Sequence, residues 1–180
     1  MRDLPLQYTA MKRLTLLLLF SLLSACSTLT ERFEIPIYSS SIPDAWAMEG
    51  RLNATVDSKT ESASFELSRQ GKYHQLTLNN SFGFGQIQVK QTAQGLLVDG
   101  KLTGLSLQEW MLIELGWKFP IAKLERLVFK HDLKDAEGWW MKVSKYQSIN
   151  GITYPKIVHF KSEYRAIKIK LLLKEINRLK

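Results

Sequence analysis

The chemistry of this chain centres on Cys26, its single cysteine. Three short zones precede it, namely the basic pair 12–13, the apolar run 14–23 and the small residues 24–25. A positive head, a short apolar stretch and small residues before a cut are typical of a secretory signal peptide, and this run is too short to span a bilayer as a helix. We therefore predict that residues 1–25 are removed on export.

The segment Leu23-Ser24-Ala25-Cys26 resembles the lipobox of bacterial lipoproteins. The resemblance implies that the Cys26 thiol takes a diacylglyceryl group, that the chain is cut before it, and that the new amine is acylated. Two or three acyl chains anchor a protein durably, whereas one holds only marginally. A buried lone cysteine after an ordinary signal peptide is the alternative. In the enterobacterial sorting pattern an aspartate after the cysteine retains the protein in the inner membrane, so Ser27 favours the outer membrane.

Charge narrows the class of partner. The whole chain carries a formal net charge of +8, and the removed segment holds Arg2, Lys12 and Arg13 against Asp3, which leaves +6. Such an excess favours anionic partners such as phospholipid headgroups, acidic proteins or nucleic acid. An exported protein rarely meets nucleic acid, so we expect a membrane or a protein.

Motifs for catalysis or cofactor binding are not found in the sequence. The three histidines, His74, His131 and His159, are scattered, and no His, Cys, Asp or Glu cluster has the spacing of metal ligands. Neither a nucleophile motif nor a glycine-rich phosphate loop occurs. We therefore expect no enzyme activity, no metal and no cofactor.

The chain divides into an exported leader, a tether and one domain. Residues 1–25 are the predicted signal peptide, with Met11 as an alternative start directly before the basic pair. Residues 26–44 are rich in Ser, Thr and Pro with little periodicity, which is typical of an extended tether. Residues 45–180 form the predicted domain, and one cysteine allows it no internal disulfide.

Most of the domain alternates apolar and polar residues with a period of two, which is typical of strands in an antiparallel sheet with one wet face. The clearest runs are 52–56, 65–67, 76–78, 87–89 and 167–173. Turn-forming residues separate the runs at Gln70-Gly71-Lys72, Gln94-Gly95 and Asn150-Gly151. The pattern predicts a meander of hairpins.

Two short helices interrupt this rhythm. Ser106-x-x-Glu109 has the spacing of a capping box and opens a helix that ends at Gly116. Pro120 fits the first position of a second helix, whose apolar stripe is Ile121, Leu124, Leu127 and Val128. We expect both apolar stripes to pack on the inner face of the sheet. The fold class is therefore mainly β with a few short helices (α+β).

A series of short motifs resembles the LolB family in order and spacing over residues 46 to 174. The first part is Gly50-Arg51-Leu52, Phe65, Tyr73, Leu76-x-Leu78 and the turn Phe82-Gly83-x-Gly85. The second part is Leu115-Gly116-Trp117, Pro120, Trp140-x-x-Val143, Tyr146, Tyr154-Pro155-x-Ile157 and Ile167-x-Ile169. No single motif is diagnostic, and their order behind a lipobox carries the resemblance.

The resemblance implies a half-open antiparallel β-barrel, closed by a helical lid over an apolar cavity. It further implies a monomeric lipoprotein on the periplasmic face of the outer membrane of a Gram-negative bacterium. Such a protein accepts lipoproteins from a LolA-like periplasmic carrier, holds their acyl chains and inserts them among the phospholipids of the inner leaflet. The predicted cavity residues are Phe65, Leu67, Leu76, Leu78, Ile87, Val89, Trp110, Leu124 and Trp140. Aromatic residues at these spacings are equally compatible with an ordinary core.

The loop at 79–85 is the predicted membrane-insertion loop. The family carries an exposed leucine here, usually as Pro-Leu-Gly, whereas this chain has Ser81 and Phe82. By position, Phe82, Gly83 and Phe84 would enter the bilayer and help deposit the cargo. The alternative is a hairpin in which Phe82 or Phe84 folds back onto the core.

Two other functions use the same concave sheet. One is an outer-membrane lipoprotein that binds a protein partner and carries no lipid. A cavity smaller than a few hundred Å3 would favour it, because acyl chains need space of about that size. The other is a carrier of a different lipid or glycolipid.

Overall fold

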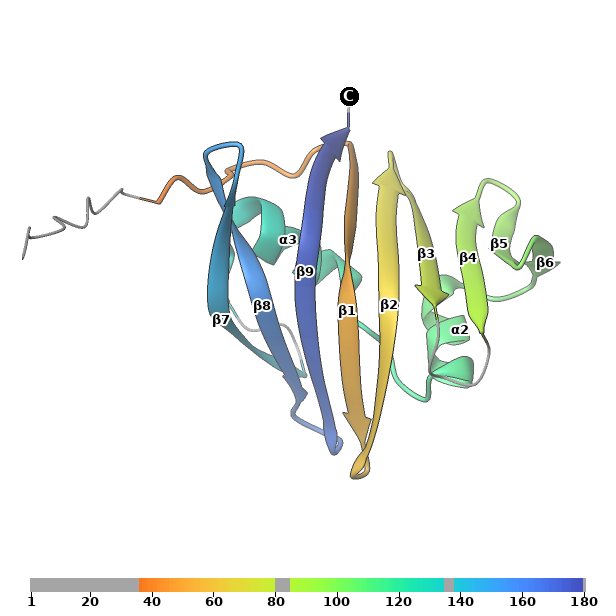
Figure 1. Ribbon diagram of the computed structural model, residues 1–180. Helices are drawn as coiled ribbons and strands as arrows, with labels where there is room; N and C mark the ends of the chain where they lie inside the picture. The colour runs from red at the N-terminus through yellow and green to blue at the C-terminus, as the bar shows by residue number, and fades with distance from the viewer. Residues whose placement is uncertain (1–35, 80–84, 135–137, 180) are drawn as a thin grey trace, which may run out of the picture. The chain divides into compact units, whose positions relative to one another are not determined.

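The computed structural model describes residues 36–79, 85–134 and 138–179 (Figure 1). These residues form nine strands and two helices. The strands are β1 (Ala45–Val56), β2 (Lys59–Gln70), β3 (Tyr73–Asn79), β4 (Gln86–Thr92), β5 (Gly95–Val98), β6 (Lys101–Thr103), β7 (Trp139–Ile149), β8 (Ile152–Ser162) and β9 (Ile167–Leu179). The helices are α2 (Leu107–Glu114) and α3 (Ile121–Lys130). The described part is mainly β, as the alternation predicts.

The strands make one antiparallel sheet in the order β6-β5-β4-β3-β2-β1-β9-β8-β7. The chain starts in the middle at β1, runs outward by hairpins to the edge strand β6, and then crosses to the other edge at β7. From there it returns inward, and β9 pairs with β1. The edge strands β6 and β7 are not neighbours, so the sheet is open. The connection from one edge to the other contains both helices.

Alternation decides which side of each strand faces the helices. In β1 the buried residues Met48, Leu52 and Ala54 alternate with exposed or half-buried ones. The same rhythm repeats in β2 and β9, so the sheet has an apolar inner face and a polar outer face. The predicted turn between β7 and β8 is present, with Asn150 at φ 51° and Gly151 at φ 76°, a pair of left-handed residues typical of a tight hairpin.

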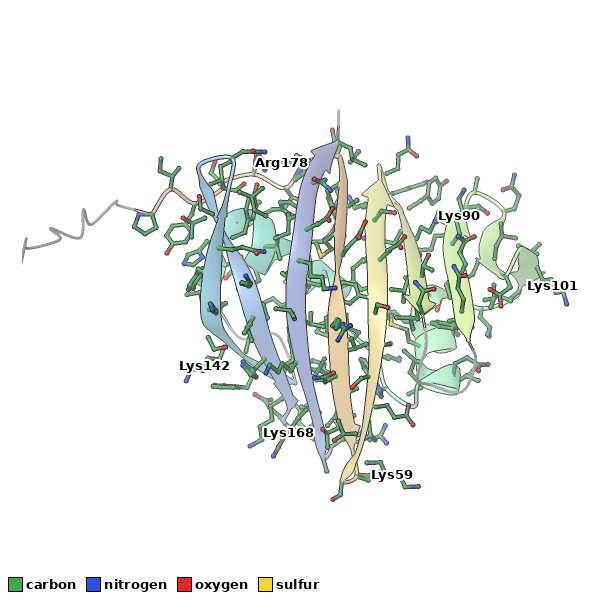
Figure 2. The ribbon with its side chains drawn as sticks, viewed as in Figure 1. Lys59, Lys90, Lys101, Lys142, Lys168 and Arg178 are labelled. Atoms are coloured by element: carbon green, nitrogen blue, oxygen red, sulfur yellow. The ribbon has the colours of Figure 1, made fainter. Side chains whose placement is uncertain are left out.

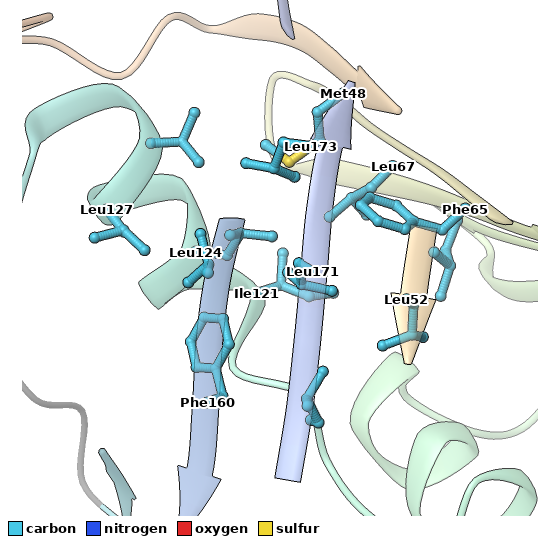
Figure 3. Close-up of a cluster of buried hydrophobic side chains, with 14 of the residues drawn as sticks. Met48, Leu52, Phe65, Leu67, Ile121, Leu124, Leu127, Phe160, Leu171 and Leu173 are labelled. Atoms are coloured by element: carbon cyan, nitrogen blue, oxygen red, sulfur yellow. The ribbon is translucent and has the colours of Figure 1, made fainter. Parts of the chain in front are cut away.

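The helices α2 and α3 also match the sequence-based prediction. Ser106 is the N-cap of α2, and its capping box with Glu109 is formed. The predicted stripe of α3 is buried, with Leu124, Leu127 and Val128 each at most 2% exposed. Figure 3 shows this stripe beside inward side chains of the sheet such as Leu171 and Leu173. The helices therefore bury the apolar inner face between the two edges.

The last residues of the predicted tether contact the folded part. The Thr153 backbone N–H donates to the Ile37 carbonyl at 2.6 Å. Tyr38 stacks on His131, with ring centroids 3.7 Å apart. Arg178 donates to Ser39 Oγ at 2.8 Å. Ordered contacts therefore begin several residues before β1.

Among the residues described here, neither helix is long and apolar enough to cross a bilayer.

Candidate functional site

A small apolar hollow lies between the sheet and the segment that carries the helices. Its lining consists of side chains from β1, β2, β3 and β9 on one side and from residues 111–124 on the other. These are Leu52, Phe65, Leu67, Leu76, Leu78, Met111, Leu115, Trp117, Phe119, Ile121, Leu124 and Leu171. Every one of them is apolar, so the hollow offers no partner to a polar ligand.

The hollow measures about 40 Å3. A void of that size has room for a few water molecules, whereas ligand pockets usually measure roughly 300–1,000 Å3. The inner face is therefore packed as a core in this conformation. Acyl chains would need a cavity of a few hundred Å3, so this closed state favours the protein-binding alternative. Lipid binding would require residues 107–130, which we call the helical segment, to move.

The predicted cavity residues fall into two groups on the inner face, and Trp140 lies apart from both. Phe65, Leu67, Leu76, Leu78 and Leu124 line the hollow. Val89, Trp110 and Ile87 belong to the same core without lining the hollow.

Trp140 lies apart from the other predicted cavity residues. It precedes the buried Met141 in β7, so strand alternation places it on the outer face, where it is 44% exposed. It therefore does not join the cavity residues on the inner face.

Helix α2 is fixed at its start by reciprocal hydrogen bonds. The Glu109 backbone N–H donates to Ser106 Oγ at 3.2 Å, and the Ser106 N–H donates to Glu109 Oε2 at 2.8 Å. The hydrogen bonds from Ser106, backbone first, lower the pKa of Glu109. Leu112 and Ile113 on the same helix point to solvent, 45% and 63% exposed. The helix thus contributes Met111 to the lining of the hollow and leaves Leu112 and Ile113 outside.

A buried polar cluster joins α3 to the sheet. Glu125 is 4% exposed, and its Oε1 accepts hydrogen bonds from Trp46 Nε1 at 3.0 Å and Arg69 Nη1 at 2.9 Å. His74 Nε2 lies 3.4 Å from the same oxygen, and His74 Nδ1 lies 3.1 Å from Gln91 Oε1. A protonated His74 would donate to both oxygens. The Glu125 cluster therefore links one helix to four strands.

Burial alone would raise the pKa of Glu125. The hydrogen bond and charge of His74, followed by those of Arg69, outweigh burial, so the net effect lowers the pKa of Glu125. The carboxylate is therefore held in its charged form by its neighbours.

Sequence reasoning missed the Glu125 cluster, although a signal was present. Glu125 follows Ile121 by four residues, which puts it on the apolar stripe of the helix. Arg69 continues the inward positions of β2, and His74 those of β3. Charged or polar residues at positions that face the core were the signal in the sequence that Glu125, Arg69 and His74 pair with one another.

Several predicted residues lie outside the described part of the chain. They are the lipid anchor Cys26, the sorting residue Ser27 and the insertion loop at Phe82, Gly83 and Phe84. Within the described ranges, no group of three or more His, Cys, Asp or Glu side chains is placed to hold a metal ion.

Comparison with known proteins shows which family this chain resembles. A family model described as "Outer membrane lipoprotein LolB" matches residues 44–132, which run from β1 to the end of α3. The curated outer-membrane lipoprotein LolB of Shewanella woodyi is 26% identical, over 91% of this chain and 89% of its own. The chain is similar to the LolB family.

Further LolB relatives match most of this chain. The LolB of a Marinomonas species is 23% identical, over 81% of this chain and 88% of its own. That of Francisella tularensis is 22% identical, over 72% of each chain. Each is named as an outer-membrane lipoprotein, so these relatives point to lipoprotein localisation.

Among solved structures, a DUF1329 family protein from Desulfovibrio piger is similar over 76% of this chain and 86% of its own. The sequence identity is 8% and the TM-score 0.44, values too low to bear on function.

Proposed function

We propose that this protein accepts lipoproteins from a LolA-like periplasmic carrier and inserts them into the inner leaflet of the outer membrane. Similarity to the LolB family carries the proposal. The wholly apolar hollow under the helical segment supports it, because acyl chains need such a surface and each methylene left in water costs about 0.8 kcal/mol. The transfer breaks no covalent bond, so it needs neither catalytic groups nor a cofactor.

Acyl chains enter, in this proposal, by displacing the helical segment from the sheet. The hollow of about 40 Å3 is too small for them as it stands. Leu115 and Phe119 line the hollow and are only half-buried, so this segment is held less firmly than the core beneath it. Lining side chains that lose contacts on opening regain them against the acyl chains. Helices α2 and α3 then act as the lid of a half-open barrel.

Anchoring and sorting complete the proposal. Residues 1–25 are removed, Cys26 receives lipid, and residues 26–44 tether domain 45–180 to the membrane. Ser27 directs the protein to the outer membrane, where it works as a monomer on the periplasmic face. Phe82, with Gly83 and Phe84, enters the bilayer and assists deposition of the cargo.

A second function is favoured by the size of the hollow. An outer-membrane lipoprotein that binds a protein partner needs no space for acyl chains, and about 40 Å3 suits it without any movement. A carrier of another lipid or glycolipid needs the same opening as a lipoprotein receptor. Cargo transfer distinguishes lipoprotein transfer from both alternatives.

The test uses residues 26–180 with Cys26→Ala, since every described strand and helix lies within this part. Carrier loaded with radiolabelled lipoprotein is mixed first with this protein and then with liposomes. We expect the parent protein to take and deposit the cargo, and Phe82→Glu to take it without depositing it. Leu102→Glu, at an exposed residue of β6, is the control and should behave as the parent.

Each outcome has a plain meaning. If the parent protein takes no cargo, lipoprotein transfer is wrong and the protein-binding function replaces it. If Phe82→Glu deposits cargo as well as the control does, the insertion loop is wrong while receptor function stands.

A further inference from the structure

Lysines gather on the outer face of β7, β8 and β9. Across the strands Trp140 lies opposite Lys161, and Lys161 lies opposite Lys168. In the next row Lys142 lies opposite His159, and His159 lies opposite Lys170. We call these six residues the basic face. They line a groove of about 540 Å3 that is open to solvent on the side of the sheet away from the helices. Figure 2 shows Lys142 and Lys168 in the same region of the sheet.

The charges of the basic face are not neutralised. The ion pairs within the described residues involve Arg69, His74, Lys123 and Arg126, and none involves a lysine of the basic face. Like charges directly opposite each other across two strands destabilise a sheet. His159 lies between Lys142 and Lys170, and burial, followed by the charges of Lys170 and Lys142, lowers its pKa. The fold therefore keeps a lysine cluster that stability alone disfavours.

The outer face also carries acidic residues. Glu49 lies opposite Glu66 on one side and opposite Glu175 on the other. This acidic row crosses β1 four residues before Asn53, which pairs with Lys170 of the basic face, and Arg51 lies on the same face between them. The strand pairing therefore places no glutamate directly opposite a lysine of the basic face.

Aromatic residues accompany the lysines. Trp140 is 44% exposed within the basic face, and Tyr164 in the turn between β8 and β9 is 78% exposed. Tryptophan and tyrosine concentrate where water meets lipid headgroups, and long lysine side chains reach the headgroups beside them. Protein interfaces, by contrast, favour arginine and are depleted in lysine. All four cations of the basic face are lysines.

We infer that the basic face binds the anionic headgroups of a phospholipid bilayer. The binding surface lies on strands β7–β9 and goes beyond the proposed function, which places membrane contact at the 82–84 loop alone. It relies on that function only for placing the protein at a membrane. The chain between Cys26 and Ile37 reaches at most about 40 Å, comparable to the roughly 36 Å length of β8. A lipid anchor on Cys26 therefore allows the basic face to touch the bilayer.

Vesicle sedimentation tests the inference. Residues 26–180 with Cys26→Ala are mixed with vesicles of phosphatidylethanolamine and phosphatidylcholine, with or without phosphatidylglycerol. The test variant replaces Lys142, Lys161, Lys168 and Lys170 by Gln. The control replaces four exposed lysines elsewhere, Lys90, Lys101, Lys118 and Lys130, by Gln, so both lose the same charge. Figure 2 shows Lys90 and Lys101 well away from Lys142 and Lys168.

We expect tight binding only to the anionic vesicles. Each lysine near an anionic surface contributes about 1 kcal/mol, or about fivefold, so the test variant, which loses four lysines, should bind roughly 600-fold more weakly and the control less than about fivefold. Trp140→Ser should weaken binding several-fold. The test variant should also unfold at an equal or higher temperature than the parent, because like-charge pairs are removed.

Three results would overturn the inference. They are equal losses in both lysine variants, equal binding to neutral and anionic vesicles, or a test variant that binds vesicles normally but no longer takes cargo from the carrier. The last result would assign the basic face to an acidic protein partner. Failure of cargo transfer by the parent protein, with vesicle binding as expected, would reject the proposed function and leave this inference intact.

Discussion

Glu125 is a carboxylate on an otherwise apolar interface. It accepts hydrogen bonds from Trp46 and Arg69 and faces His74, and it is almost fully buried. A buried carboxylate is tolerated only where such partners replace water. The cluster ties α3 to the sheet at a distance from the hollow, since none of its residues lines it.

Removing the carboxylate should destabilise the fold. Glu125→Ala leaves Arg69 and Trp46 without their acceptor, at an expected cost of about 3 kcal/mol in the free energy of unfolding. Urea denaturation at pH 7 measures this cost. Glu125→Gln keeps the shape and one acceptor oxygen and should cost less. A loss below about 1 kcal/mol in Glu125→Ala would show that the cluster contributes little.

The same residue predicts a pH dependence. The pKa of Glu125 lies below its ordinary value of 4.5 in the folded state. Its contribution is therefore fully present above about pH 4.5 and is lost as the pH falls through the folded pKa. Denaturation at pH 7 and pH 3.5 should show a smaller acid loss in Glu125→Gln than in the parent. Identical acid losses of stability in the parent and in Glu125→Gln would contradict a lowered pKa of Glu125 in the folded state.

Single residues were predictable where one local rule decided their place. Leu67 and Leu78 follow strand alternation, and the structure puts both at the hollow. Trp140 follows the same alternation but on the opposite side, because its register relative to Met141 decides the face. The partners of Glu125 lie more than fifty residues away in sequence, so only the folded register brings them together.

At the scale of elements, Gly50 allows the centre of the sheet to form. The register between β1 and β9 shifts between Glu49 and Gly50, which marks a bulge. A Cβ on Gly50 would lie 2.1 Å from the Leu172 carbonyl oxygen and 3.0 Å from Phe65 Cε1. The close approach of two central strands therefore requires glycine.

Gly50→Ala should destabilise the protein by about 2–3 kcal/mol, because the backbone of β9 has to shift. Thermal unfolding followed by circular dichroism measures the effect. Gly71→Ala is the control for glycine replacement in a turn, where nothing lies within 4 Å of the added atom but φ is positive. Equal unfolding temperatures for Gly50→Ala and the parent would contradict the close approach.

The capping box of α2 provides a second test at the scale of elements. Ser106→Ala removes one of its two reciprocal hydrogen bonds and should cost the helix about 1 kcal/mol. If entry of acyl chains unwinds the first turn of this helix, the cost of opening falls by the same amount, and a dansylated fatty acid should bind about fivefold more tightly. Fluorescence titration measures the affinity. Unchanged or weaker binding would contradict unwinding of α2 and leave displacement of the intact helix.

The strands, turns and helices could be predicted from local sequence more fully than the way in which they are connected and paired. The alternating runs, the turns and both helix starts were all predictable from propensity and capping. The bulges in β7, where the register shifts near Lys145, left no local pattern to follow. The crossing from β6 to β7 depends on how the whole sheet is ordered.

For the folded part as a whole, the two faces of the sheet have opposite characters. The helices cross the inner face between two unpaired edges and fill it with apolar side chains. The outer face carries lysines and glutamates. The general architecture was predictable, but the size of the hollow was not, because it depends on how side chains from four strands, two helices and the connection between the helices pack together.

Photo-crosslinking tests the central claim most directly, that acyl chains of a cargo lipoprotein lie between the helical segment and the sheet. A benzoylphenylalanine replaces Leu115, which lines the hollow, or Glu114, which is exposed on α2. Each protein is mixed with carrier loaded with an acyl-labelled lipoprotein and irradiated. We predict a labelled adduct at position 115 and little at position 114. Cargo retained without an adduct at 115, or with equal adducts at both positions, would contradict the account.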